Sequence, residues 1–420
     1  MGFASGYLDK GALFPALISE LPDEKTGIII VVPAYDEPGI TKLLDSLKKC
    51  ERPGCPVEIM IVINAPQGAS QTSLANNRLT AENIESWKMQ NNDCFFRLFY
   101  ISVEPVIRRW GVGLARKTGM DEAARRFDAI DNPEGVILNL DADCTVEPSY
   151  MKSVEEQLYR RKDRSACSIY FEHPLSGDDL PSVFYDYITL YELHLRFYYQ
   201  ALAYTGFPWV YHTVGSAMAV KAVEYIRAGG MNRRQAGEDF YFIQKLVPSD
   251  GYFYLNNTSI YPSARSSCRV PFGTGATMAR MNAEKEAALL SYNFRAFTDL
   301  KFLFTLSTEI FAVKEEKELA SLYRELPESI RLFTTEGEWT DRLIEIKGNT
   351  SGPASFRKRF FGWFNMFRVV KFLNQAHITS YEKVDITVSA FEYLRETGQI
   401  LQFSNTKDIL GYYRRMERGS

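Results

Sequence analysis

Two carboxylates one residue apart, Asp141 and Asp143, follow an apolar run in the segment GVILNLDADCTVEPSY, residues 135–150. The run predicts a buried strand, and carboxylates at i and i+2 can converge on one cation where a strand ends and turns. Carboxylates and substrate phosphate oxygens are the ligands that Mg²⁺ or Mn²⁺ takes in sites for nucleoside diphosphates. The pair is therefore a candidate metal site, and an Asx turn closing the strand is the alternative.

A second acidic pair, Glu238 and Asp239, follows two glycines and precedes the aromatic-rich segment FYFIQKL. A carboxylate at the start of a helix often caps it. A carboxylate held in the same place can also act as a general base toward an attacking hydroxyl. Residue types alone leave both roles open.

Basic residues occur in two glycine- or serine-rich segments. In GVGLARK, Gly113 permits close backbone approach, and Arg116 and Lys117 bring positive charge to phosphates or a ribose, unless they lie on a solvated helix face. In YPSARSSCRVPFGTG, Arg265 and Arg269 lie four residues apart in a loop that could close over a diphosphate, and a solvated basic loop is the alternative. The glycines of GVGLARK lack the third glycine of a dinucleotide-binding fingerprint.

The apolar pattern predicts that the secondary-structure elements that carry these residues alternate between strands and helices. Continuous apolar runs predict buried parallel strands at 27–33, 57–64, 95–102 and 135–141, with helical patterns between them. This alternation predicts an α/β fold with a doubly wound, mostly parallel sheet, which binds ligands at the carboxyl ends of its strands. Pro33, Tyr35, Glu37, Asn64 and Asp141 lie at such ends.

The rest of the chain changes character along its length. A tyrosine-rich helix is expected at 183–204, where Tyr185, Tyr191 and Tyr198 could stack on sugars although their spacing favours a core. A further strand is expected at 214–220, and helical periodicity dominates beyond about residue 276. We therefore expect a catalytic domain at 1–275 and a helical C-terminal region at 276–420.

Composition excludes several classes of protein. The 420 residues carry a net charge of −3 and no nucleic-acid-binding motif, so nucleic acid is not an expected partner. Six cysteines without C-x-x-C spacing and four histidines indicate neither a structural zinc site nor a disulfide framework, as expected in a reducing cytoplasm. The first 20 residues lack the pattern of a secretion signal, and no window reaches the ~18 consecutive apolar residues of a membrane span.

In chain order, VVPAYDEP, GVGLARKTGMDEA, LNLDADC and GSAMAV…AGGM…GEDF resemble the family 2 glycosyltransferases of the GT-A fold, over about residues 26–275. The resemblance implies a nucleotide-sugar donor, a divalent cation (Mn²⁺ or Mg²⁺), and an inverting transfer with Asp239 as base. Glu238 would bind the acceptor or orient Asp239, and Tyr35 would stack on the base. The candidate donor-binding residues are Pro33, Tyr35, Glu37, Asn64, Gly113, Arg116, Lys117, Asp141, Arg265 and Arg269, and the candidate metal ligands are Asp141 and Asp143.

Some residues depart from the family pattern. Asn64 replaces the acid that commonly ends the second strand and contacts the base, so the donor is expected to be a UDP- or GDP-sugar without a choice between them. Many members of the family have a histidine after the Glu-Asp pair as a further metal ligand. In this chain the only histidine after that pair is His377, far along the helical region. The Q-x-x-R-W element and membrane helices of processive synthases are absent, which favours transfer of a single sugar.

Two other functions remain open at this stage. A nucleotidyltransferase acting on sugar phosphates also uses carboxylate-held Mg²⁺, but PAYDEPG lacks its glycine-rich phosphate loop. A noncatalytic sugar-nucleotide binder is disfavoured by the retained Asp143 and Asp239.

The acceptor is expected to be a sugar or a lipid-linked molecule. FFGWFNMFRVVKFL, residues 360–373, lies in a stretch without acidic residues between Glu345 and Glu382. A basic amphipathic element of this kind can lie on an anionic membrane, although apolar residues all around the helix favour burial. We expect a cytoplasmic protein, with peripheral contact at the inner face of the membrane as the alternative.

Overall fold

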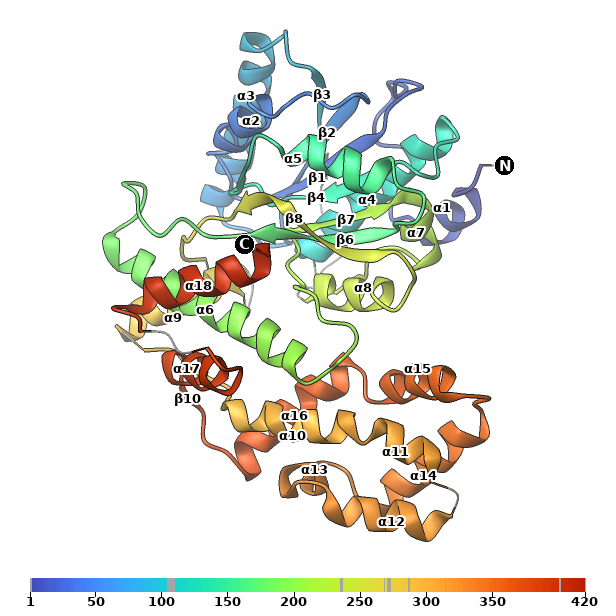
Figure 1. Ribbon diagram of the computed structural model, residues 1–420. Helices are drawn as coiled ribbons and strands as arrows, with labels where there is room; N and C mark the ends of the chain where they lie inside the picture. The colour runs from blue at the N-terminus through green and yellow to red at the C-terminus, as the bar shows by residue number, and fades with distance from the viewer. Residues whose placement is uncertain are drawn as a thin grey trace. The chain divides into compact units, whose positions relative to one another are not determined.

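The computed structural model describes residues 2–103, 110–234, 237–267, 269, 273–285, 288–313, 315–399 and 402–419. Cys268 and part of the predicted phosphate-closing loop lie outside these residues. The chain forms two compact units (Figure 1). The first comprises Met1–Ser182 with Tyr211–Arg280, and the second comprises Val183–Val210 with Met281–Ser420.

The first unit is built on an eight-stranded sheet with the order β3-β2-β1-β4-β7-β6-β8-β5. Its strands are β1 (Ile28–Ala34), β2 (Val57–Asn64), β3 (Phe96–Val103), β4 (Val136–Asn139), β5 (Thr145–Val146), β6 (Ala166–Phe171), β7 (Met218–Lys221) and β8 (Tyr252–Tyr261). Strands β3, β2, β1 and β4 are parallel, as are β6 and β8, whereas β7 runs antiparallel to both β4 and β6. The prediction of a mostly parallel α/β sheet is confirmed. The predicted strand at 214–220 is β7, while β6 and β8 had not been predicted.

Burial explains the apolar runs. Every residue of β1 and of β2 is buried, because helices cover both faces of the sheet. Helices α2 (Thr41–Lys48) and α3 (Gln71–Gln90) follow β1 and β2, and α4 (Val112–Ala129) carries the chain from β3 back across the sheet to β4. Since crossovers are right-handed, this reversal puts α4 on the face opposite α2 and α3 (Figure 1).

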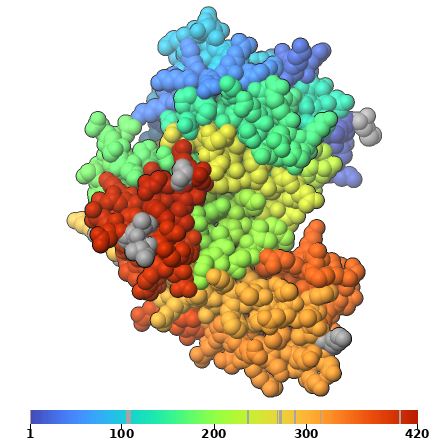
Figure 2. Space-filling view, in the orientation of Figure 1, coloured from blue at the N-terminus to red at the C-terminus, as the bar shows by residue number. Residues whose placement is uncertain are grey.

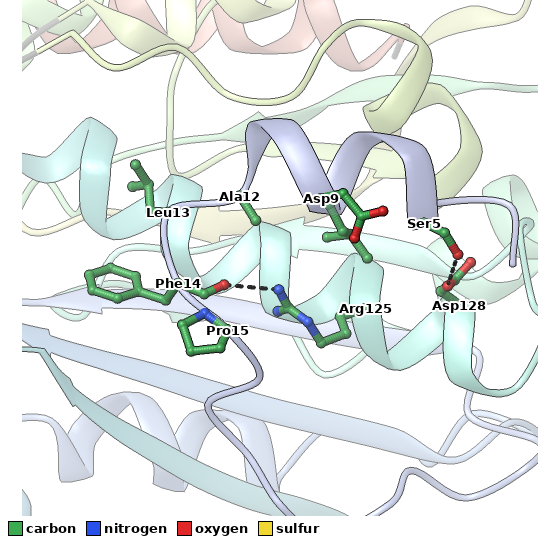
Figure 3. Close-up of a pocket in the computed structure, with 9 residues that line it drawn as sticks. Ser5, Asp9, Ala12, Leu13, Phe14, Pro15, Arg125 and Asp128 are labelled. Atoms are coloured by element: carbon green, nitrogen blue, oxygen red, sulfur yellow. Dashed lines mark hydrogen bonds between the residues drawn. The ribbon is translucent and has the colours of Figure 1, made fainter. Parts of the chain in front are cut away.

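Helix α4 is buried despite its many charged residues. The segment before β1, which contains α1 (Ser5–Gly11), runs over α4, and its backbone groups pair with α4 side chains. The carboxylate of Glu122 accepts the N–H groups of Leu17 and Ile18 at 3.2 and 3.1 Å. The guanidinium of Arg125 donates to the carbonyl of Phe14 at 2.9 Å (Figure 3). Glu122 and Arg125 of α4 therefore hold the N-terminal segment against the helix.

Four short helices complete the first unit around the sheet. They are α5 (Tyr150–Val154), the π-helix η1 (Glu155–Tyr159), α7 (Ala222–Arg227) and α8 (Glu238–Leu246). Helix α9 (Thr274–Glu284) contains the boundary between the units.

The second unit is helical, as predicted. Its helices are α6 (Ser182–Tyr204), α10 (Phe294–Thr305), α11 (Ser307–Ala312), α12 (Glu316–Glu325), α13 (Glu328–Phe333), α14 (Glu336–Gly348), α15 (Pro353–Trp363), α16 (Met366–Thr379), α17 (Ile386–Glu396) and α18 (Thr406–Arg418). One antiparallel pair of two-residue strands, β9 (Leu290–Ser291) and β10 (Val384–Asp385), joins them.

The tyrosine-rich helix α6 belongs to this helical unit. The compact units therefore do not follow a single division of the chain at residue 275. Its Phe197 ring packs edge-on against Phe297 at 5.6 Å. Its Glu192 binds Arg414 of α18 at 2.7 Å, and α6 and α18 lie side by side (Figures 1 and 2). A helix between β6 and β7 in sequence joins the later unit because its apolar face and its buried charge find their partners there.

Two other expectations concern this unit. Tyr185 is buried, and Tyr198 packs on Tyr292 and Phe297, which supports the core interpretation of the α6 tyrosines. Most large apolar side chains of 360–373 are buried as well. Within the described ranges, no helix combines the length and apolarity needed to cross a bilayer. Contact with a membrane surface stays a prediction.

Candidate active site

Two of the predicted segments meet because their strands are neighbours. Strands β1 and β4 are paired in parallel, so the residues after them emerge at the same edge of the sheet. Tyr35 and Glu37 follow β1, and Asp141 and Asp143 follow β4. The carboxyl ends of adjacent strands therefore carry three of the carboxylates of the candidate site.

Arg116 of α4 joins the strand-end acids to the Glu-Asp pair. Its Nη2 donates to Asp141 at 2.5 Å, and its Nη1 donates to Glu238. The side chains of Arg116 and Glu238 are 5% and 2% exposed, whereas that of Asp141 is 38% exposed. Burial alone would lower the pKa of Arg116, but Asp141, Glu238 and Asp239 together raise it, so this residue stays a cation. Arg116 therefore holds in place both the buried carboxylate of Glu238 and the solvent-facing carboxylate of Asp141.

Glycines make room for this arrangement. A Cβ added at Gly215 would lie 2.3 Å from Nη1 of Arg116, and one added at Gly113 would lie 2.9 Å from Cγ of Glu238. Real Cβ atoms do not approach other heavy atoms so closely, so a side chain at either position would displace the guanidinium or the acid. Gly113 therefore acts through close packing within the cluster.

Two further arginines reach the cluster from the segment after β8. Nε of Arg265 donates to Asp143 at 2.8 Å, and its Nη2 donates to Glu37. Arg269 donates to Glu37 at 2.6 Å and to the backbone carbonyl of Tyr35. The segment after β8 is thus bound to the ends of both β1 and β4.

Asp239 lies in the first turn of α8, after Gly237, which has φ 70° in the left-handed region that glycine favours. Its carboxylate accepts the N–H of Phe240 at 2.7 Å. Burial raises the pKa of Asp239 above its ordinary value, and Asp141 adds to the rise, whereas Arg116 opposes it. Burial also raises the pKa of Glu238, again against Arg116. A carboxylate with a raised pKa is a better proton acceptor than an ordinary one.

The cluster carries more negative than positive groups. It contains the five carboxylates of Glu37, Asp141, Asp143, Glu238 and Asp239 and the three guanidiniums of Arg116, Arg265 and Arg269. Burial raises the pKa of Asp143, and Asp141 and Glu37 add to the rise while Arg265 opposes it. The excess of two negative charges equals the charge of one divalent cation.

The fit of such a cation can be judged from the donor set. Asp141 and Asp143 supply hard oxygen ligands, and each uses only one carboxylate oxygen in its ion pair with an arginine. No group of three or more His, Cys, Asp or Glu side chains in the described part of the chain is arranged to hold a metal ion. The two aspartates therefore fit a shelf on which other ligands come from substrate and water.

Three of the predicted donor-binding residues make contacts away from this cluster. The ammonium of Lys117 binds Asp121 at 3.0 Å and the Tyr7 hydroxyl at 2.6 Å, under the N-terminal segment. The side-chain amide of Asn64 is 3.0 Å from the carbonyl of Ala34. Pro33 is buried within β1.

The Asn64 amide is also used on its other side. Its oxygen accepts the indole N–H of Trp110 at 3.1 Å. The amide therefore ties the ends of β1 and β2 to the start of α4. Its hydrogen-bonding groups are taken up by the protein itself.

From the sequence we gave no role to two residues of the site segments, Gly215 in the cluster and Asp36 next to Glu37. Gly215 is the first residue of the GSAMAV block and was given no role of its own, although a glycine next to a strand start is a signal of close approach. Asp36 has φ 60°, unusual for a residue other than glycine, and its carboxylate accepts from Asn76 at 2.6 Å. From the sequence we assigned a role to the neighbouring Glu37 and not to Asp36.

No family model matches the sequence, and no curated protein matches it either. Among solved structures, residues 1–349 of TarS from S. aureus with UDP-GlcNAc are 14% identical, with 81% of this chain and 93% of that chain covered and a TM-score of 0.39. The mannosyltransferase PcManGT from Pyrobaculum calidifontis, with GDP-Man and Mn²⁺, is 12% identical, with 94% and 93% covered and a TM-score of 0.37. Glucosyl-3-phosphoglycerate synthase from Mycobacterium tuberculosis is 13% identical, with 64% and 83% covered and a TM-score of 0.34. Because identities and TM-scores are this low, function must be inferred from the chain's own residues.

Proposed function

We propose that this protein is a non-processive glycosyltransferase of the GT-A type that moves a sugar from a UDP- or GDP-sugar to an acceptor hydroxyl with inversion. The observation that carries the proposal is the pair of contacts of Arg116, which join Asp141 of the LNLDADC block to Glu238 of the GEDF block. Arg265 adds Glu37 of the VVPAYDEP block. All four blocks that resemble the glycosyltransferases thus contribute to one cluster.

In this proposal Asp239 takes the proton of the acceptor hydroxyl as its oxygen attacks the anomeric carbon. The raised pKa of Asp239 favours proton uptake. Glu238 is buried and bound to Arg116, so it holds the start of α8 in place and does not need to exchange protons. Attack from the side opposite the leaving diphosphate gives inversion.

Asp141 and Asp143 would hold Mn²⁺ or Mg²⁺, which supplies positive charge for the leaving diphosphate. Arg265 and Arg269 already bind the strand-end acids and can turn their guanidiniums toward phosphate oxygens. Tyr35, half-buried after β1, would pack against the base. The acceptor remains a sugar or a lipid-linked molecule.

A thermal-shift titration with UDP and with GDP, each with Mn²⁺ and with EDTA, tests this proposal. We expect one nucleotide to stabilise the protein in Mn²⁺ and not in EDTA, by about 2.7 kcal/mol at a concentration a hundredfold above Kd. Asp143→Ala should lose the stabilisation. Asp179→Ala is the matched control, because Asp179 is 77% exposed and pairs with the surface residue Lys42, away from the cluster.

Equal stabilisation in EDTA and in Mn²⁺, unchanged in Asp143→Ala, would refute the metal shelf. Nucleotide binding without any sugar transfer to a broad acceptor panel would instead favour the noncatalytic binder.

A further inference from the structure

A pocket lies in the helical unit, and the residues that line it are far along the chain from those of the acidic cluster. It has a volume of about 390 Å³ and is formed where α13, α14, α15 and α16 meet. Three aromatic side chains, Phe333, Trp363 and Phe367, line it. Its size is in the range of small-molecule sites, and aromatic faces are the surfaces on which a ligand ring can pack.

Polar groups lie among these rings. The guanidinium of Arg368 is 4.9 Å from the centroid of the Trp363 ring and 5.0 Å from that of Phe333. It donates to Glu338 at 2.7 Å, so its charge is already neutralised. Lys371 lines the pocket from the next turn of α16 and is exposed.

Two hydrogen-bond donors on residues that line this pocket have no partner among the described residues. Nε1 of Trp363 and Nε of Arg368 are buried without an acceptor anywhere in the described residues. A buried donor left without an acceptor destabilises the folded protein, so such groups in native proteins call for an explanation. An acceptor from a ligand or from water would remove this destabilisation.

The charge balance selects among possible ligands. An anion would satisfy the two donors, but it would also face the carboxylate of Glu338, which already neutralises Arg368, and the other cation of the lining, Lys371, is exposed to solvent. A neutral polyol avoids this repulsion, because each hydroxyl can accept from an N–H and donate to a carboxylate. The apolar face of a sugar ring also suits aromatic walls.

We propose that the pocket between α13, α14, α15 and α16 binds a neutral saccharide unit, with Trp363 and Arg368 as hydrogen-bond donors and Glu338 as acceptor. The site goes beyond the proposed function and does not depend on it. In a glycosyltransferase, this pocket would bind a sugar residue of a saccharide acceptor or product other than the sugar residue that reacts.

Titration calorimetry on the full chain, without nucleotide or divalent cation, tests the site. The saccharide probes are maltotriose, triacetylchitotriose and mannotriose, and inorganic phosphate tests whether the pocket binds an anion instead. We expect one trisaccharide to bind with Kd of about 1 mM and phosphate not to bind. Trp363→Phe keeps an aromatic ring but removes the N–H, and should weaken binding about tenfold.

Trp209→Phe is the matched control, since Trp209 belongs to the same unit but does not line the pocket. Trp363→Phe should keep its melting temperature within about 2 °C of wild type, because the N–H that it removes has no partner. Asp143→Ala should bind the trisaccharide normally, which separates this site from the acidic cluster.

Three results would overturn the proposal. The first is that none of the trisaccharides gives a heat of binding at ~20 mM, well above the expected Kd. The second is that Trp363→Phe and Trp209→Phe bind the trisaccharide with equal affinity. The third is that phosphate binds more strongly than the trisaccharide and that Lys371→Gln loses the phosphate binding.

Discussion

Asp141 lies 2.5 Å from a guanidinium nitrogen of Arg116, although 25 residues separate the two in the chain. The other terminal nitrogen of Arg116 donates to Glu238, which is 122 residues away. One buried side chain on α4 therefore sets the position of an acid at a strand end relative to an acid at a helix start. The geometry of the proposed site depends on this residue more than on either acid alone.

Replacing Arg116 should damage both stability and function. Arg116→Met leaves the buried carboxylate of Glu238 without its cation, so we expect a loss of about 3–5 kcal/mol in the free energy of unfolding, measured with denaturant. Arg161→Met is the control, because Arg161 pairs with Asp163 on the surface, where solvent screens the pair, and should lower the free energy of unfolding much less. Similar losses in both variants would mean that the Arg116 contacts contribute little.

Asp239→Asn should separate donor binding from transfer. We expect nucleotide affinity near wild type and transfer slower by about 10²-fold or more, the range for loss of a general base. Because the pKa of Asp239 is raised, the wild-type rate should fall on acidification at a higher pH than an ordinary aspartate would give. A pH–rate profile of single-turnover transfer measures this. A normal rate in Asp239→Asn would mean that Asp239 is a helix cap, bound to the N–H of Phe240, and is not the base.

Asp143→Asn should make the protein without ligands more stable at neutral pH. The folded-state pKa of Asp143 is raised, first by burial, so the folded protein binds this proton more tightly than the unfolded chain does. Wild-type stability therefore rises as the pH falls through the raised pKa. We expect Asp143→Asn to melt about 1–3 °C higher at pH 7 in EDTA, with the difference shrinking on acidification.

Asp163→Asn provides the opposite sign for comparison. Hydrogen bonds from Arg161 lower the pKa of Asp163 to about 2, so the stability that Asp163 contributes is present at neutral pH and is lost as the pH falls through that value. Asp163→Asn should therefore not melt higher than wild type at pH 7. If both asparagine variants shift in the same direction, the environment of Asp143 is not the cause.

Gly230→Ala should loosen the N-terminal segment. A Cβ at Gly230 would lie 1.8 Å from the Tyr7 hydroxyl, whereas one at Gly229 would meet nothing within 4 Å. Both glycines have positive φ, 71° and 72°, so alanine at either position costs about 1 kcal/mol of backbone strain. We expect Gly230→Ala to lose about 1–2 kcal/mol more than Gly229→Ala in denaturant unfolding. Tyr7→Phe in the same chain should recover part of that extra loss.

The sequence by itself determined the parallel half of the sheet. Strands buried on both faces need continuous apolar runs, and these runs placed β1, β2, β3 and β4 within one or two residues of their bounds. Because adjacent parallel strands end at one edge, the sequence also predicted that Glu37 and Asp141 lie near each other. Strand β8 escaped prediction because Asn, Thr and Ser interrupt its apolar residues, whereas β6 is buried throughout and is interrupted only by Ser168.

Only the tertiary structure decided which charged residues face the site. Arg116 and Lys117 are neighbours on α4, but successive helical side chains point about 100° apart. One meets Asp141 and Glu238, and the other meets Asp121 and Tyr7 under the N-terminal segment. Which face is the active one depends on what packs over each side of the helix.

The same holds for the longest links of the site. Arg265 reaches Glu37 across 228 residues, and the amide of Asn64 is used up by Trp110 and Ala34. Local spacing encodes the period of a helix or a strand, and so it gives the elements and their order. It carries no information on which side chain, far along the chain, neutralises a given charge; chain folding decides that, because a buried charge or amide is stable only where a partner meets it.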